Sequence, residues 1–411
     1  MGQPWKDRIL KMDIQMIWSW TLLGPKLERQ KCFMPAISQP KMKRSLPTHP
    51  LCGADCATLW RLLTRSGGFK RERIGDLATM MATSLLRWPF DCLEKAWVRI
   101  QPDSNPEGAP PVFILGHWRS GTTHLYNLLS RAPRFGYLPP IATGLPWNML
   151  TLGKWLEPLL IRSLPSERFI DNVAVKPDSP QEDEIALANM MDISFYHGLY
   201  FPKRFFEHFK QGLFLEEGHP EVINRWKQTF GYFMKKLSLL NQGRPLLVKN
   251  PVYTARLGLL LEMYPKARFI HIHRNPYRVY QSMKNFYLNL FRELSLQDYE
   301  QLSLDKLVLE PYPLIMDRLI QDSKEVPAKQ WLELSYESLD LRPMEVLRQA
   351  YQHLELGLFN QDRPFFEHYL RSIKTYKKNA FSYPQESVDK VDQFWGTYVN
   401  RWGYRSPNTL C

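Results

Sequence analysis

One short stretch of the chain, residues 113–125, carries the residue types of an anion-binding loop. It reads FILGHWRSGTTHL, in which an apolar run leads into Gly116, a polar loop follows, and Gly121 precedes two threonines. The spacing nearly matches the phosphate-binding pattern G-x-x-x-x-G-K-[ST], with Thr123 in the last position. Backbone N–H groups of such a loop, and of the first turn of the helix after it, point toward a bound anion. We therefore predict that this loop holds a phosphate-like group.

The loop lacks the lysine that an NTPase places at its β- and γ-phosphates. Thr122 stands in that position, and Arg119 lies three residues earlier. The later predicted strands end in Lys249, Arg274 and Tyr336, so none supplies an aspartate of the Mg²⁺-binding kind. Cationic side chains must then neutralise the transferred group in place of a metal. Sulfuryl transfer has this requirement, because a sulfuryl group carries one negative charge less than a phosphoryl group.

A second group of polar residues follows a later apolar strand, RFIHIH. The sequence RNP at 274–276 comes directly after this strand, and Ser282 lies eight residues beyond Arg274. An arginine can hold a phosphate with two parallel hydrogen bonds. Ser282 falls in the second turn of the following helix, where its hydroxyl can reach the same anion. A third and weaker pattern is SYESL at 335–339, followed by Pro343.

In the order and spacing of these patterns the chain resembles the sulfotransferases that use 3′-phosphoadenosine 5′-phosphosulfate (PAPS). The resemblance covers about residues 105–405, and the segments QEDE, LLVKNP and TAR are similar to the bacterial branch. It implies that PAPS is the sulfuryl donor, that Arg274 and Ser282 hold its 3′-phosphate, and that no metal takes part. Lys377 and Lys378 stand where cytosolic members have R-K-G, and they are further candidate ligands. The loop that holds the 5′-phosphosulfate comprises Arg119, Ser120, Gly121, Thr122 and Thr123.

The transfer also needs cations at the breaking bond and a base for the acceptor hydroxyl. Arg119 is the first candidate cation by its place in the loop. Lys249 is the second, because the carboxyl end of a strand in an open α/β sheet faces the ligand. Many family members have K-x-H at this point, but here the lysine is followed by Asn-Pro-Val. We predict the base at Glu182, then Asp183, with His124 as the alternative. The same acids could instead only complement the N-terminus of the next helix.

The elements that must position these residues alternate between strands and helices. Apolar runs predict strands at 111–115, 246–251, 267–276 and within 329–339, and helical periodicity follows each strand. This order predicts an α/β fold with a P-loop-type parallel sheet flanked by helices. The predicted regions are a poorly ordered basic leader (1–50), a helical segment (51–104) and the sulfotransferase domain (105–411), in which a largely helical region (135–243) covers the substrate.

Two other functions are alternatives: nucleic-acid binding, which the basic charge suggests, and a kinase of the same fold. The chain of 411 residues has 54 Lys and Arg against 41 Asp and Glu, for a formal net charge of +13. Such a balance suits nucleic acid, a membrane surface or a phosphorylated or sulfated small molecule. No compact nucleic-acid-binding motif appears, so we expect no nucleic-acid partner. A P-loop small-molecule kinase is the other alternative, but its lysine and metal-binding aspartate are missing.

The remaining features concern location and acceptor. The five cysteines form no disulfide framework, which suggests reduced thiols in a cytoplasmic protein. Cys52 and Cys56 lie near His49, but no second pair of ligands is close enough in sequence for a zinc site. No apolar run is long enough for a transmembrane helix. The acceptor stays open among small molecules, lipids, carbohydrates and peptides. The aromatic run at 195–206 either lines its pocket or packs in the core.

Overall fold

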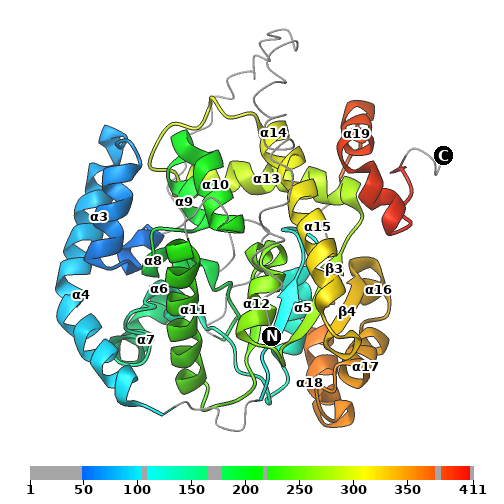
Figure 1. Cartoon of the computed structure of the whole chain (residues 1–411), viewed down its shortest axis with the longest axis horizontal. Helices are drawn as coiled ribbons and strands as arrows, with labels where there is room; N and C mark the ends of the chain where they lie inside the picture. The colour runs from blue at the N-terminus through cyan, green and yellow to red at the C-terminus, as the bar shows by residue number, and fades with distance from the viewer. Residues whose placement is uncertain (1–48, 103–108, 164–177, 216–219, 375–380, 408–411) are drawn as a thin grey trace. The chain divides into compact units, whose positions relative to one another are not determined.

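The computed structural model describes residues 49–102, 109–163, 178–215, 220–374 and 381–407 (Figure 1). Residues 45–411 form one compact unit, so the predicted helical segment and the predicted catalytic domain belong to the same body. Lys377, Lys378 and nearly all of the predicted leader lie outside the described residues.

Four parallel strands form one sheet in the order β2-β1-β3-β4, which confirms the predicted fold class. In the central strand β1, every residue is buried, as expected of a parallel strand with helices on both faces. Strand β2 is shorter than predicted, because Pro251 begins a 3₁₀ helix directly after Asn250. The strands are β1 Val112–Leu115, β2 Leu247–Lys249, β3 Arg268–His273 and β4 Trp331–Ser335.

Alternate residues of each strand face two different hydrophobic cores. Val112 and Ile114 point into a core shared with three helices, whereas Phe113 points to the opposite side and joins the larger core. The three helices are α5 (Thr122–Leu129), α17 (Pro343–His353) and α18 (Phe359–Ser372). Phe113 stacks on Phe269 of β3 with ring centroids 5.6 Å apart. Side chains thus pack against both faces of the sheet.

Each strand leads into a helix at its carboxyl end, and side-chain caps begin several of these helices. Asn275 accepts a hydrogen bond from the Tyr277 N–H, and Ser335 accepts one from the Ser338 N–H. These caps hold the strand-to-helix turns in which the predicted site residues lie. The helices after β1, β2, β3 and β4 are respectively α5 Thr122–Leu129, η4 Pro251–Ala255 with α12 Leu257–Met263, α13 Pro276–Leu294, and α16 Tyr336–Leu341.

The described parts of the chain contain further helices. They are η1 Pro50–Gly53, α3 Cys56–Arg65, η2 Arg71–Arg73, α4 Ile74–Ile100, α6 Pro140–Gly144, α7 Leu152–Ser163, α8 Glu184–Met190, α9 Phe195–Tyr200, η3 Pro202–Arg204, α10 Phe205–Phe214, α11 Pro220–Leu240, α14 Leu304–Leu309, α15 Pro311–Asp322, η5 Ser323–Glu325, η6 Ala328–Gln330, α17 Pro343–His353, α18 Phe359–Ser372 and α19 Gln385–Arg401.

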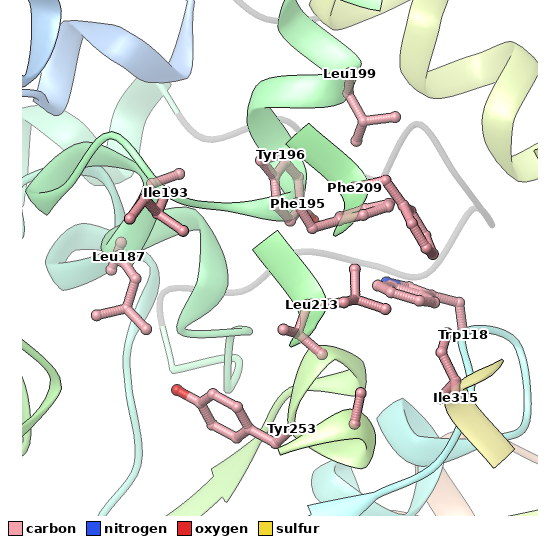
Figure 2. Close-up of a cluster of buried hydrophobic side chains, with 14 of the residues drawn as sticks. Trp118, Leu187, Ile193, Phe195, Tyr196, Leu199, Phe209, Leu213, Tyr253 and Ile315 are labelled. Atoms are coloured by element: carbon pink, nitrogen blue, oxygen red, sulfur yellow. The ribbon is translucent and has the colours of Figure 1, made fainter. Parts of the chain in front are cut away.

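The aromatic run at 195–206 packs as core. Phe195, Tyr196 and Leu199 are buried on α9 and lie against Phe209 of α10 (Figure 2). Trp118, from the loop after β1, packs on Phe195 with ring centroids 4.5 Å apart. The helical middle region therefore rests directly on the glycine-bounded loop and helps to fix its position.

Candidate functional site

Two glycines with positive φ angles shape the loop after β1. Gly116 has φ of +147°, and its N–H donates a hydrogen bond to Oγ1 of Thr254 at 2.9 Å. Gly121 has φ of +101°, and a Cβ there would lie 2.2 Å from Cδ2 of Tyr336. Both positions need glycine, because a side chain would meet backbone or a packed ring and would also strain the main chain. The helix α5 begins directly after Gly121.

Arg119, inside the loop, lies beside the second predicted motif. Its Nε donates a hydrogen bond to Oγ of Ser282 at 2.8 Å. Its carbonyl oxygen accepts one from Arg274 at 3.3 Å. The Arg274 guanidinium in turn lies over the Tyr336 ring, 4.1 Å from the centroid. Residues from the turns after β1, β3 and β4, distant in sequence, are thus brought together at the carboxyl end of the sheet.

The backbone of Arg119 carries strain at this point. Its φ of +68° is in the left-handed region, which residues with a Cβ rarely adopt. Such a conformation costs about 1–3 kcal/mol and persists where the surroundings enforce it. Here the bonds to Ser282 and Arg274 fix both the side chain and the carbonyl group.

Two buried polar atoms in this group have no hydrogen-bond partner within the described parts of the chain. They are Oγ of Ser120 and Nε of Arg274. Burial lowers the pKa of the Arg274 guanidinium, because removal from water disfavours its charge. A bound anion would supply the missing acceptors and reverse this cost. The arrangement therefore fits a phosphate group between the loop and the start of α13.

A second cluster lies at the end of β2. The buried Lys249 forms an ion pair with Glu182 and donates to Oγ1 of Thr123 at 3.3 Å. Thr123 belongs to the first turn of α5, so the lysine reaches the same loop from the other neighbouring strand. The cluster puts a cation, a carboxylate and a loop hydroxyl in direct contact, which is what proton transfer beside a charged group requires.

The three adjacent acids point to different partners. Asp183 is buried, accepts a hydrogen bond from the Tyr253 hydroxyl, and has its pKa raised to about 8, chiefly by burial. Glu184 accepts bonds from Oγ of Ser194 at 2.7 Å and from Nδ2 of Asn250 at 2.9 Å. Of these acids, Glu182 is the one in contact with Lys249.

The histidines near the sheet, including the candidate base His124, contact aromatic and polar side chains. The ring of His124, on α5, lies near that of Tyr336, with centroids 6.3 Å apart. His271 bonds to Glu333 at 3.0 Å, and His273 bonds to the Tyr404 hydroxyl at 2.8 Å and stacks on Trp402. These contacts support a structural role for the two strand histidines.

Comparison with known proteins identifies the chain. The model of the "Sulfotransferase family" matches residues 110–360, which is well over half of the sequence. This chain belongs to the sulfotransferase family. It is similar to the omega-hydroxy-beta-dihydromenaquinone-9 sulfotransferase Stf3 of Mycobacterium bovis and Mycobacterium tuberculosis, with 34% identity over 295 residues, which is 72% of this chain and 75% of the relative.

Two solved structures of mycobacterial sulfotransferases have a fold similar to that of this sulfotransferase. Sulfotransferase STF9 from Mycobacterium avium is 17% identical, with a TM-score of 0.65 over 85% of this chain and 91% of the other. Sulfotransferase STF1 from Mycobacterium tuberculosis H37Rv, also 17% identical, has a TM-score of 0.54 over 82% and 90%. Because the chain belongs to the sulfotransferase family, this function is favoured over the kinase and nucleic-acid-binding alternatives.

The structure of the sulfotransferase brings six of the predicted site residues into two groups. One contains Arg119, Arg274 and Ser282, and the other contains Lys249, Glu182 and Thr123. The Arg119 side chain turns toward Ser282, and its role at the sulfuryl group stays a prediction. Ser120 and Thr122 are buried in the loop itself.

Sequence reasoning missed two residues at this site. Thr254 fixes the N–H of Gly116, and Tyr336 packs against both Gly121 and Arg274. The TAR and SYESL segments that contain them were recognised as patterns, but neither pattern indicates a contact with the loop. No cluster of three or more metal-ligating side chains occurs in the described ranges. Within the same ranges, no helix has the length and apolar character to cross a membrane.

Proposed function

We propose that this sulfotransferase takes a sulfuryl group from PAPS and transfers it to the hydroxyl of a lipid acceptor, without a metal ion. The observation that carries the donor assignment is the convergence of Arg119, Arg274 and Ser282, with Ser120 Oγ and Arg274 Nε buried and lacking partners. In this proposal, the donor's 3′-phosphate binds Arg274 and Ser282, and Arg119 contributes a further positive charge.

The 5′-phosphosulfate then lies on the loop that Gly116 and Gly121 bound. Loop N–H groups and the N-terminus of α5 point toward it. Two hydroxyls of the loop region, those of Ser120 and Thr123, add donors. Lys249 reaches this end of the donor through its contact with Thr123. The two clusters of the site therefore correspond to the two ends of one nucleotide.

The reaction needs one proton acceptor and one cation, and the second cluster supplies both. The acceptor oxygen attacks sulfur, the bond between sulfur and the 5′-phosphate oxygen breaks, and the acceptor proton passes to the Glu182 carboxylate. Protonation of Glu182 releases Lys249 from the ion pair that joins them in this structure. The ammonium group can then neutralise the charge that develops on the leaving phosphate oxygen.

The acceptor class rests on the named relative. Stf3 is, by its name, a sulfotransferase of omega-hydroxy-beta-dihydromenaquinone-9, and it shares 34% identity with this chain. We propose that the present enzyme likewise sulfates a hydroxyl on an apolar, lipid-like molecule. The described cysteines Cys52, Cys56 and Cys92 are free thiols, which supports our prediction of a cytoplasmic enzyme.

A donor-exchange assay tests the proposal without knowledge of the acceptor. The enzyme should release p-nitrophenol from p-nitrophenyl sulfate when adenosine 3′,5′-bisphosphate is present to receive the sulfuryl group, and excess EDTA should leave this rate unchanged. The variant Arg274→Ala should need much more bisphosphate for the same rate. A rate that EDTA abolishes and Mg²⁺ restores would contradict the metal-free mechanism, and release that does not depend on the bisphosphate would contradict the donor assignment.

A further inference from the structure

Helix α4 buries its polar side and exposes its apolar side, which is the reverse of an ordinary surface helix. Its buried residues recur every three or four positions and are mostly polar, whereas the residues between them are mostly apolar and exposed. The exposed apolar side chains from Leu85 to the end of the helix are 38–78% accessible. They are Leu85, Leu86, Trp88, Phe90, Leu93, Trp97 and Ile100, and we call this set the α4 apolar face.

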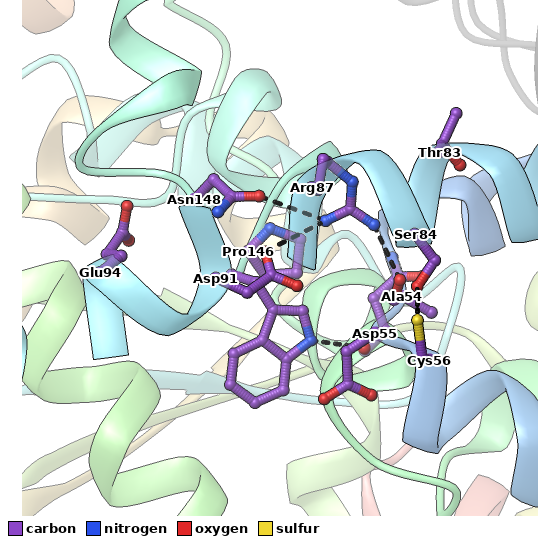
Figure 3. A network of polar contacts seen from close by, with 12 residues as sticks. Ala54, Asp55, Cys56, Thr83, Ser84, Arg87, Asp91, Glu94, Pro146 and Asn148 are labelled. Carbon is purple, nitrogen blue, oxygen red and sulfur yellow. Dashed lines mark hydrogen bonds and ion pairs between the residues drawn. The ribbon is translucent and has the colours of Figure 1, made fainter. Parts of the chain in front are cut away.

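The buried side of α4 is held by a polar network that fixes the rotation of the helix. Arg87 donates to the carbonyl oxygens of Cys52 and Ala54 at 2.9 and 2.7 Å, and to Oδ1 of Asn148 at 3.3 Å (Figure 3). Arg87 also lies 3.7 Å from Asp91, one turn further along. These bonds would be lost if the helix turned its apolar face inward.

A second part of the network is entirely buried. Glu94 forms an ion pair with Lys236 of α11 at 2.7 Å, with both side chains inaccessible to water. Glu94 also accepts bonds from the N–H and the hydroxyl of Thr151. Breaking a buried pair of this kind is strongly unfavourable, because each charge would be left in an apolar interior. The buried polar network thus holds the α4 apolar face on the outside of the protein, although the exposure of apolar surface to water is unfavourable.

We propose that the α4 apolar face docks this enzyme on an anionic membrane surface, with α4 lying in the plane of the interface. A helix with one apolar face and a tryptophan-rich composition is the type that binds at the boundary of headgroups and acyl chains. Trp88 and Trp97 belong to the face, and Trp60 of the neighbouring α3 is also exposed. Indole rings prefer this interfacial level, because they combine an apolar ring with a polar N–H.

Charge favours an anionic surface as the occupant. From residue 77 to residue 102 the acids are Asp91 and Glu94, and both are buried, while Arg99 is exposed. Lipid headgroups of negative charge complement Arg99. A second copy of the chain would not, because in a two-fold contact the face meets itself and brings Arg99 no acidic partner.

Binding to vesicles tests this proposal with the full chain and without donor or acceptor, so the result does not depend on the proposed reaction. We expect the enzyme to sediment with vesicles of phosphatidylcholine and phosphatidylglycerol, and far less with phosphatidylcholine alone. The double variant Leu86→Glu/Leu93→Glu alters two side chains that are 74% and 66% exposed. It should reduce binding to the mixed vesicles at least tenfold.

A matched control makes the same chemical change elsewhere. Leu341, on α16, and Leu358, next to α18, are 78% and 65% exposed, which is close to the exposure of Leu86 and Leu93. The variant Leu341→Glu/Leu358→Glu therefore adds the same two charges at equally exposed positions. This variant should bind the mixed vesicles like the wild type, and the p-nitrophenyl sulfate assay should give the same rate for both double variants. Failure of the wild type to bind, or equal binding by both double variants, would overturn the proposal. Self-association in solution that Leu86→Glu/Leu93→Glu abolishes, with no vesicle binding, would instead identify a second copy as the occupant.

Discussion

The Nε of Arg119 donates a 2.8 Å hydrogen bond to Oγ of Ser282, although the two residues are 163 positions apart in the chain. This bond joins the loop after β1 to the second turn of α13. Arg274 completes the connection by donating to the carbonyl oxygen of Arg119. The loop after β1 and the residues proposed to hold the 3′-phosphate are therefore joined by hydrogen bonds in the protein alone.

Replacement of Arg274 should weaken donor binding selectively. A charge-assisted hydrogen bond is worth about 1.5–3 kcal/mol, so Arg274→Ala should raise the Kd for adenosine 3′,5′-bisphosphate roughly ten- to a hundredfold or more. Adenosine 5′-monophosphate lacks the 3′-phosphate, and its weaker binding should hardly change. Calorimetric titration with both nucleotides measures the difference.

The exposed Arg348 on α17 offers a control for this experiment, because Arg348→Ala removes the same charge from the outer side of a helix. Its Kd values should equal those of the wild type. If Arg274→Ala weakened both nucleotides equally, the residue would not be the 3′-phosphate ligand.

Replacement of Glu182 should separate chemistry from binding. Glu182→Gln removes the proposed base and keeps the shape of the side chain, so kcat should fall by about 10²–10⁴ while bisphosphate binding stays nearly intact. Asp183→Asn is the comparison, because that carboxyl points to Tyr253 and not to Lys249. Full kcat in Glu182→Gln would show that the base lies elsewhere, with Asp183 or His124 as the next residues to test.

The three adjacent acids have different partners in the structure, and these partners could not be predicted from the sequence. The glycine loop, the four strands and the RNP turn could be predicted, because local patterns specify backbone conformation and strand order. Residues 182–184 are chemically alike and adjacent, and only tertiary contacts decide that one meets Lys249, one Tyr253 and one Asn250. The turn of the Arg119 side chain toward Ser282 is equally a long-range contact that no local pattern encodes.

Helix α4 shows the same limit in another form. The sequence predicts a helical segment over residues 51–104, but it does not say which face of each helix is buried. The structure places the polar stripe inside, because Glu94 finds Lys236 and Arg87 finds carbonyl groups of the 52–54 turn. Periodicity identifies two faces of a helix, but the partners of each face decide which one is buried.

Asp183 should make stability depend on pH. Its pKa is raised by burial from 3.8 to about 8, so between these values the folded protein keeps a proton that the unfolded chain has released. Stability must therefore fall as pH rises through this window, by at most about 1.4 kcal/mol per pH unit for one proton. Buried histidines with lowered pKa act in the opposite direction below pH 6.5, and they are His117, His197, His208 and His273.

Comparison with Asp183→Asn isolates the carboxyl, because the four histidines and Lys236, whose pKa burial lowers to about 8, titrate alike in both proteins. From pH 6.5 to about 8 the melting temperature of the wild type should therefore fall relative to that of Asp183→Asn. A difference between the two melting temperatures that does not change with pH would assign the effect to another group.

Gly121→Ala should damage the loop. The new Cβ would lie 2.2 Å from the Tyr336 ring, at a φ of +101°. We expect a loss of stability of about 1–3 kcal/mol and weaker bisphosphate binding. Gly231, in α11, has open space at its Cβ position, so Gly231→Ala should stabilise by roughly 0.5–1 kcal/mol and leave binding unchanged. Comparison of unfolding curves and Kd values for the two variants checks this, and normal binding in Gly121→Ala would argue against the loop as the donor site.

We propose that the two clusters bind the two ends of PAPS. The most direct measurement is the melting temperature of the wild-type enzyme during titration with adenosine 3′,5′-bisphosphate and, separately, with adenosine 5′-monophosphate. Binding to the folded state alone raises stability by mass action. The bisphosphate should therefore raise the melting temperature at concentrations ten- to a hundredfold lower than the monophosphate needs. This difference in affinity corresponds to the free energy of about one charge-assisted hydrogen bond to the 3′-phosphate. A melting temperature that millimolar bisphosphate leaves unmoved, or that both nucleotides raise equally, would contradict the claim.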